Sequence, residues 1–168
     1  MRKTFEYLLL SLMLILFITG CKPDAKNASE DIFQFKDSFV GDNSAVGNIV
    51  NQLPGAEHLK HYELKTDVEP YGITLNYNGL NSEQEYQETV IYNATFLIAL
   101  VQNVDWITVH SDKREFTITK ENIQEWYSKE LRDVPNELEL IKLINKCLVD
   151  ISRNNVISCF SSLLKVQK

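Results

Sequence analysis

The sequence is poor in the residues that build metal and redox sites. Its 168 residues include three histidines and three cysteines. It contains no HExxH or HxH motif, and His58 and His61 are three positions apart on an expected strand, where alternation turns them to opposite faces. We therefore predict no metal site and no cofactor.

Motifs of nucleophilic catalysis and phosphate binding are also missing. There is no G-x-S-x-G elbow or S-x-x-K pair at a helix start. The glycines of segment 41–47 lack the Gly-Lys-Ser/Thr ending of a phosphate-binding loop. Glu83, Glu85 and Glu88 crowd an expected helix start, where the helix dipole already favours negative charge. We predict no catalytic residue and a non-catalytic role.

The chain lacks an excess of basic charge. It has 17 Lys+Arg against 23 Asp+Glu, and removal of Arg2, Lys3 and Glu6 with a signal peptide leaves 15 against 22, a net charge of −7. An acidic surface repels phosphates and anionic head groups, which argues against nucleic-acid binding. Hydrophobic residues make up 44% and charged residues 24%, as in an ordinary globular domain.

The N-terminus lacks a hydrophobic run long enough to span a bilayer. Arg2 and Lys3 precede an apolar run from Tyr7 to Ile18, which is about a dozen residues where a span needs about 20. Ile18-Thr19-Gly20-Cys21 follows and resembles a bacterial lipobox, with Ile in place of the commoner Leu. Cleavage between Gly20 and Cys21 leaves a cysteine whose thiol takes a diacylglyceryl group, and two acyl chains suffice for stable anchoring.

This pattern predicts four segments. Residues 1–20 are a signal peptide, residues 21–31 a lipidated N-terminus and polar tether, residues 32–151 an extracytoplasmic domain, and residues 152–168 a C-terminal helix. Acylated Cys21 would hold the protein in the lipid bilayer of the cell membrane, on its extracytoplasmic face.

Hydrophobic periodicity indicates the elements of the domain. Ile32–Phe39 is expected to pack on the core, and Val40–Ser44 has turn and helix-cap residues. Helices are expected over Ala45–Leu53, from a Ser82/Glu85 capping box to about Val101, after Thr119 to about Lys129, over Asn136–Ile151, and over Val156–Lys168. Alternation predicts one hairpin of His58–Thr66 with Tyr71–Tyr77, and a second of Trp106–His110 with Glu115–Thr119.

These elements predict an α+β fold with a single domain. A small antiparallel sheet of two hairpins would be packed against helices. Beyond Cys21 the chain has two cysteines, Cys147 and Cys159. A break at Arg153–Asn155 could fold the last helix back and allow a disulfide between them, and the alternative is two buried thiols.

Two turns are the candidate binding segments, because loops carry function more often than cores do. The first has Gly41, Asp42, Asn43 and Ser44, and the second is centred on Pro70 and Tyr71. The alternative is that both turns use Gly and Pro for backbone reasons alone.

Several stretches resemble a bacterial domain of unknown function, DUF4825, over roughly residues 35 to 130. They are Phe39–Ile49, Leu53-Pro54, Tyr62–Tyr77, Asn93–Thr95, Asn103–Ile107, Thr117–Glu121 and Trp126-Tyr127. The family has no assigned activity, so the resemblance implies location and architecture and no catalytic residues. Leu138–Lys168 lies outside it.

We therefore expect a lipid-anchored module that binds a partner protein, a peptide or an envelope ligand. One alternative is a cell-envelope enzyme acting on wall material, which needs a deep pocket with converging ionisable groups. Another is an accessory subunit of a membrane complex, which needs an exposed apolar patch of several hundred Å².

Overall fold

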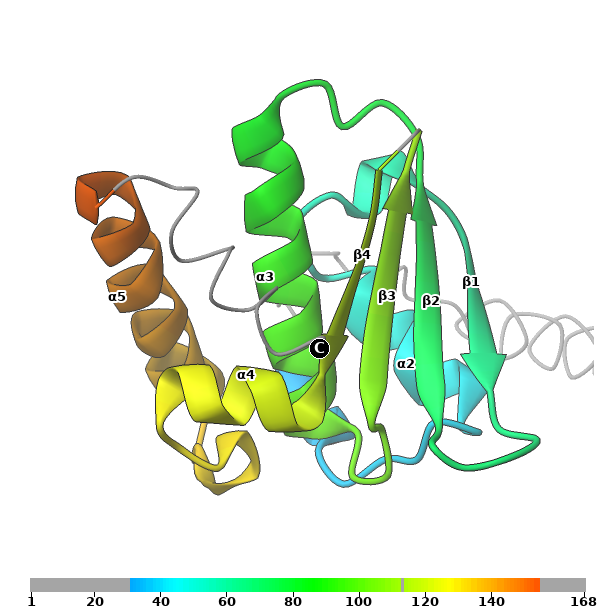
Figure 1. The fold of residues 1–168 in the computed structure, drawn as a ribbon. Coiled ribbons are helices and arrows are strands. Elements are labelled where there is room, and N and C mark those ends of the chain that lie inside the picture. Colours follow the sequence, from blue (N-terminus) through cyan, green and yellow to red (C-terminus); the bar gives the residue numbers. More distant parts are fainter. Residues whose placement is uncertain (1–30, 113, 155–168) are drawn as a thin grey trace, which may run out of the picture.

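The structure is a computed structural model that describes residues 31–112 and 114–154, with side chains as far as Leu148. The described elements form one sheet with helices on one side of it (Figure 1). In chain order they are η1 (Ile32–Phe35), α2 (Asn43–Val50), η2 (Ala56–His58), β1 (Leu59–Lys65), β2 (Gly72–Tyr77), α3 (Glu83–Leu100), β3 (Trp106–Ser111), β4 (Arg114–Thr119), α4 (Lys120–Tyr127), η3 (Leu131–Asp133) and α5 (Glu137–Asn154).

The strands lie in the order β1-β2-β3-β4. The pairs β1–β2 and β3–β4 are antiparallel, so the α+β class and both predicted hairpins are confirmed. The prediction of a wholly antiparallel sheet was wrong at its centre, because β2 and β3 run parallel. Between them α3 carries the chain back along the sheet, so β3 starts at the same end as β2, as in a β-α-β unit.

Helix α3 is the central element of the core. The predicted capping box is present: the Ser82 hydroxyl accepts from the Glu85 N–H at 3.0 Å, and the Glu85 carboxylate accepts from the Ser82 N–H at 3.5 Å. From Asn93 to Leu100 every residue is buried, so the second half of this helix is enclosed. The helix ends at Leu100 with Val101 as its C-cap, in agreement with the predicted end at about Val101.

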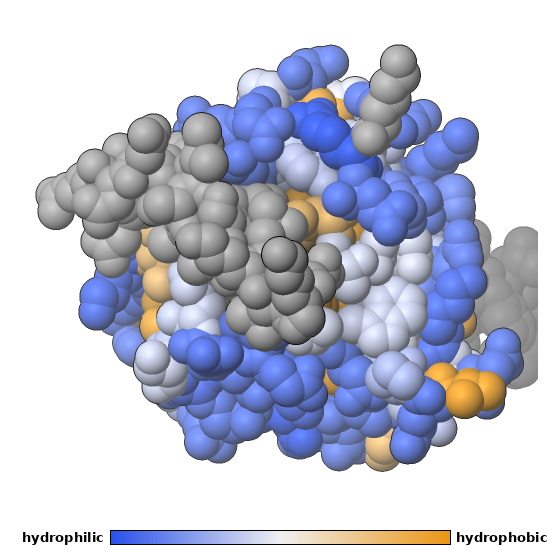
Figure 2. Space-filling model, viewed as in Figure 1, coloured by the Kyte–Doolittle hydropathy of each residue, from blue (hydrophilic) through white to orange (hydrophobic). Residues whose placement is uncertain are grey.

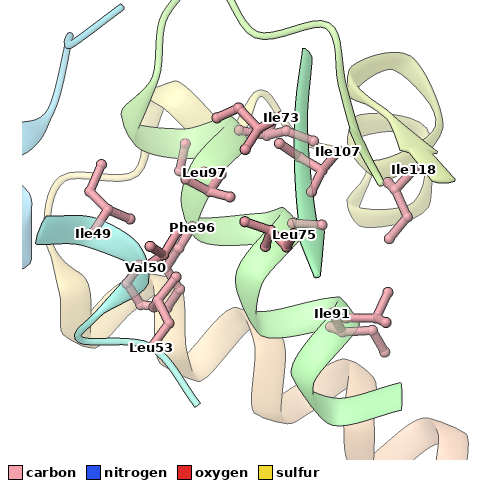
Figure 3. Packing of buried hydrophobic residues seen from close by; sticks show 14 of the residues in the cluster. Ile49, Val50, Leu53, Ile73, Leu75, Ile91, Phe96, Leu97, Ile107 and Ile118 are labelled. Atoms are coloured by element: carbon pink, nitrogen blue, oxygen red, sulfur yellow. The ribbon is translucent and has the colours of Figure 1, made fainter. Parts of the chain in front are cut away.

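One face of the sheet, called here the inner face, packs against α2 and α3. Figure 3 shows strand residues meeting those of the two helices. The strands contribute Ile73, Leu75, Ile107 and Ile118, α3 contributes Ile91, Phe96 and Leu97, and α2 with its following turn contributes Ile49, Val50 and Leu53. Helix α5 lies outside α3 and buries Leu140 and Ile144. Burial of these side chains is the main source of stability.

The first described segment only partly follows the prediction that it packs on the core. Ile32 is buried, whereas the Phe39 side chain is 55% exposed. Ser38 forms a bridge with Val101, and the Gln102 N–H donates to the Ser38 carbonyl at 2.9 Å. The chain therefore joins the domain beside the C-terminal end of α3.

Helix α5 was predicted to end near Ile151 and ends at Asn154. The helix predicted over Val156–Lys168, the lipobox and the tether up to Glu30 lie outside the described residues. None of the described helices has the length and hydrophobicity needed to cross a membrane.

Candidate functional site

The described helices pack on the inner face and leave the other face of the sheet uncovered (Figure 1). Every second residue of each strand points to this second face, called here the polar face. Neighbouring residues on the four strands therefore form rows that run across the sheet. The register gives the rows Lys65-Gly72-Trp106-Thr119, Glu63-Thr74-Thr108-Thr117 and His61-Asn76-His110-Glu115. In Figure 2 the surface over β2 and β3 is pale, with hydrophilic residues bordering it.

Charged groups on the polar face stand on its outer strands and pair with one another. On β1, Lys65 Nζ lies 2.6 Å from Glu63 Oε2, and His61 Nε2 lies 3.7 Å from Glu63 Oε1. The hydrogen bond from Lys65 holds the pKa of Glu63 below its ordinary value. Across β3 and β4, His110 Nδ1 lies 3.3 Å from Glu115 Oε2. Each carboxylate of the three rows therefore has a lysine or a histidine beside it, and the two histidines carry a charge only when they are protonated.

The centre of the polar face carries hydroxyl and amide groups. Thr74 and Thr108 are short side chains between the longer ones, and Thr108 Oγ1 lies 2.7 Å from Thr117 Oγ1. Next to them, the amide nitrogen of Asn76 is buried and has no hydrogen-bond partner among the described residues. A buried donor without a hydrogen-bond partner costs free energy.

Trp106 is the one large aromatic side chain of these three rows, and it is only partly buried. Its ring lies on Gly72, where a Cβ atom would come within 2.1 Å of Cε2. Its Nε1–H donates to the Pro70 carbonyl at 3.1 Å. Sequence reasoning missed this pair, although a glycine inside a strand is a known sign of a close approach to the backbone.

The predicted turn at Pro70 and Tyr71 adjoins the polar face. It connects β1 and β2 through a cis Glu69–Pro70 peptide bond. The Tyr71 N–H donates to Asp105 Oδ2 at 2.6 Å, and the Asp105 N–H donates back to the Tyr71 carbonyl at 2.8 Å. Through its carbonyl, Pro70 also holds Trp106. This candidate segment therefore fixes the edge of the polar face.

The predicted turn at Gly41 to Ser44 is exposed. Gly41 and Asp42 precede α2, and Asn43 and Ser44 are its first two residues. Asp42 caps the helix, since its Oδ1 accepts from the Ala45 N–H at 3.0 Å. Asn43 accepts from the Tyr62 hydroxyl at 2.9 Å. Helix capping and the bond to Tyr62 thus account for both side chains, and a binding role for this turn stays a prediction.

Both turns are held by the connection between α3 and β3. Asn103 Oδ1 accepts from the Val40 N–H at 2.8 Å, two residues before Asp42. Asp105, in the same connection, binds Tyr71 as described. The two candidate segments therefore lie at one end of the domain, which is also where the chain joins it from the N-terminal side.

The predicted disulfide cannot be followed in the structure. Cys147 lies half-buried on α5, beside the core. Cys159 lies outside the described residues. Cys21 and Gly20 do so as well, so lipidation and the disulfide stay predictions.

Away from the polar face, a cleft lies between the start of α3 and the turn before η2, and it is called here the acidic cleft. Three carboxylates, those of Glu57, Glu85 and Glu88, are among the groups lining it. Glu85 belongs to the capping box, and Glu88 accepts from the Gln84 amide at 2.8 Å. His58 Nε2 lies 3.7 Å from Glu85 Oε1, and His58 belongs to η2 rather than to the strand on which it was expected.

Within residues 31–112 and 114–154, no three His, Cys, Asp or Glu side chains are grouped so that they could hold a metal ion. Glu85 and Glu88 have roles in α3, through its cap and its first turns.

Comparison with known proteins gives one family. Neither the curated proteins nor the solved structures contain a match to this chain. Residues 32–123 match the domain of unknown function DUF4825, from η1 to the first half of α4 and including all four strands. The match covers more than half of the sequence, and the chain belongs to the DUF4825 family.

Proposed function

We propose that this protein is a lipid-anchored module on the extracytoplasmic face of the cell membrane, and that it binds a ligand or partner through the polar face. The single observation that carries the anchor is Ile18-Thr19-Gly20-Cys21 behind a short apolar run. The observation that favours binding is a complete sheet face, free of covering helices in the described part of the chain, with Trp106 at its edge.

The spacing along the chain agrees with this arrangement. Nine residues lie between Cys21 and Asp31, the first described residue. Fully extended, this stretch would reach at most about 35 Å. The domain would therefore stay close to the bilayer, with the α3–β3 connection and both candidate turns at the end where the tether joins.

The arrangement of ionisable groups favours a binder over an enzyme. On the polar face the carboxylates are paired with Lys65, His61 and His110, and in the acidic cleft Glu85 and Glu88 have structural contacts. General acid–base catalysis needs a group whose proton is available to a substrate. An envelope enzyme remains the competing hypothesis, and the cleft at Glu57 would be its site.

The test is metabolic labelling of cells with a fatty-acid analogue, followed by membrane fractionation. We expect label on the wild-type protein and none on Cys21→Ala, which should be shed into the medium. Cys147→Ala is the matched control, because it removes a different cysteine and should keep the label. Equal labelling of wild type and Cys21→Ala, or no label on either, would refute the anchor.

A further inference from the structure

The segment that joins the predicted tether to the domain, residues 32–39, is rich in phenylalanine. Three of its eight residues are Phe33, Phe35 and Phe39. The first two are partly buried against the core, and the Phe39 side chain is 55% exposed. The part of the domain nearest to the tether therefore carries aromatic side chains that the core covers only in part.

Phe39 is held in its exposed position by the backbone on either side of it. The Gln102 N–H donates to the Ser38 carbonyl at 2.9 Å, and the Val40 N–H donates to Asn103 Oδ1 at 2.8 Å. Val40 is fully buried, whereas the ring of its neighbour Phe39 points outward. The ring cannot enter the core while these bonds hold, so it forms a fixed apolar projection.

This projection lies at the end of the domain that the tether reaches. The stretch from Cys21 to Asp31 spans at most about 35 Å, so acylation of Cys21 brings this end, and no other, close to the bilayer. The β1–β2 turn is at the same end (Figure 1), and its Val68 is 78% exposed. Val68 stands between Asp67 and Glu69, which head-group phosphates repel, so Phe39 is the better placed of the two to enter lipid.

The charges beside Phe39 permit a close approach to head groups. A hollow next to it is lined by three cationic and three anionic side chains, Lys36, Lys120, Arg132, Asp37, Glu130 and Asp133. Arg132 Nη2 lies 2.6 Å from Asp37 Oδ1. The formal charges of this hollow cancel, whereas the whole chain carries a net charge of −6. Lipid phosphates are therefore repelled less here than over the rest of the surface.

We propose that residues 32–39 lie on the surface of the extracytoplasmic leaflet, with the Phe39 ring inserted between the lipid head groups. The proposal rests on the proposed function, because the anchor supplies the affinity for the membrane. Phe39 supplies an orientation, since an apolar side chain at the interface is stabilised by burial among the acyl chains. The start of α3, with the acidic cleft, then faces away from the membrane (Figure 1).

The experiment uses the mature chain, residues 21–168, with Cys147→Ala and Cys159→Ala. The thiol of Cys21 is then coupled to a maleimide phospholipid in phosphatidylcholine vesicles. Phe39→Trp places a fluorescent reporter at the proposed contact, and phosphatidylcholine brominated on the upper part of its acyl chains serves as the quencher. An interfacial side chain lies about 5–10 Å deep, so we expect at least about twofold lower emission from residue 39 in brominated vesicles than in plain ones.

Gln84→Trp is the matched control. Gln84 is exposed in the first turn of α3, at the opposite end of the domain. Its emission should be the same in both kinds of vesicle. The coupled parent, which has Trp106 and Trp126, gives the background that is subtracted from each variant.

Gly41→Trp provides a second reporter in case Phe39→Trp disturbs the fold. Gly41 lies two residues from Phe39, and a Cβ atom added to it would meet nothing within 4 Å beyond its chain neighbours. Its emission should also fall in brominated vesicles, beside an intact Phe39. Thermal unfolding of every variant shows that the reporters sit on folded protein.

Equal emission of folded Phe39→Trp and Gly41→Trp in brominated and plain vesicles would overturn the proposal. Quenching of Gln84→Trp to the same extent would overturn it as well, because the domain would then have no fixed orientation. The maleimide lipid supplies the anchor chemically, so the outcome does not depend on lipidation in cells. Missing fatty-acid label on Cys21 would refute the proposed anchor, whereas missing quenching would refute this inference alone.

Discussion

The two faces of the sheet are made by the same strands and differ in the burial and polarity of their side chains. On β2 and β3 the inner residues are Ile73, Leu75, Ile107 and Val109, all essentially without exposure. The residues that alternate with them form the polar face and, apart from Trp106, are small or polar: Gly72, Thr74, Asn76, Thr108 and His110. A substitution on the inner face therefore changes stability, whereas one on the polar face can change recognition and leave the fold intact.

Among the substitutions on the inner face, Phe96→Ala should cause the largest loss of stability. Phe96 is among the largest fully buried side chains, and its removal leaves a cavity between α2 and α3. We expect the free energy of unfolding to fall by about 3–5 kcal/mol, measured by urea denaturation of the Cys21→Ala chain. A loss below about 1 kcal/mol would mean that the core collapses around the gap.

Removal of the buried polar side chain of Asn93, on α3, should lower the free energy of unfolding by less. The Asn93 side chain is fully buried, donates to the carbonyls of Pro54 and Thr89, and accepts from the Tyr77 hydroxyl at 3.0 Å. Asn93→Ala takes these hydrogen bonds from the Pro54 carbonyl and the Tyr77 hydroxyl, and we expect a loss of about 2–3 kcal/mol. The exposed Asn48 offers the matched control, since Asn48→Ala should stay within about 0.5 kcal/mol of the parent.

Alkaline pH should lower the stability of the domain through buried tyrosines on its inner side. Burial raises the pKa of Tyr86 to about 12 and raises the pKa of Tyr77 further. Both groups bind their protons more tightly when folded, so their contribution is complete below the unfolded pKa of about 10 and is lost as pH rises toward the folded values. The urea midpoint should fall between about pH 10 and pH 12.

Tyr86→Phe removes one of these titrating groups and tests the assignment. The decline of the urea midpoint with pH should become shallower in this variant. A decline of unchanged slope would show that other groups, such as the lysines, cause the alkaline loss.

The smallest effect is expected on the polar face. Thr108→Val removes the hydrogen bond to Thr117 and keeps a β-branched side chain of similar shape. We expect a change in unfolding free energy of about 1 kcal/mol or less. A loss as large as that of Asn93→Ala would mean that the two faces do not divide stability from recognition.

The local structure was largely predictable because its signals are short-range. Ser82 with Glu85 and Thr119 are caps that the sequence shows directly, and both helices begin as predicted. Strand alternation likewise predicted the hairpin of His58–Thr66 with Tyr71–Tyr77, which β1 and β2 form. The family resemblance, placed at roughly residues 35 to 130, agrees with the matched residues 32–123.

The arrangement between elements was not predictable in the same way. Alternation shows which residues share a face, and it does not show which strands become neighbours. Placing β3 beside β2 brings Trp106 onto Gly72 and sets His61 and His110 on either side of Asn76. The candidate turn at Pro70 and Tyr71 lies two residues and one residue before Gly72, on which the Trp106 ring lies.

The way in which the chain joins the domain has a mechanical consequence. Tension on the segment before Asp31 would act first on η1 and on the single bridge of Ser38 with Val101. Beside the buried Ile32, the bonds that resist it include the Gln102 N–H to the Ser38 carbonyl, the Gln102 side chain to the Asp37 carbonyl, Lys36 to the Val134 carbonyl, and Arg132 to Asp37. These can give way one after another while the register of β1 to β4 is unloaded. Under tension the attachment therefore peels and lengthens, and the polar face keeps its shape.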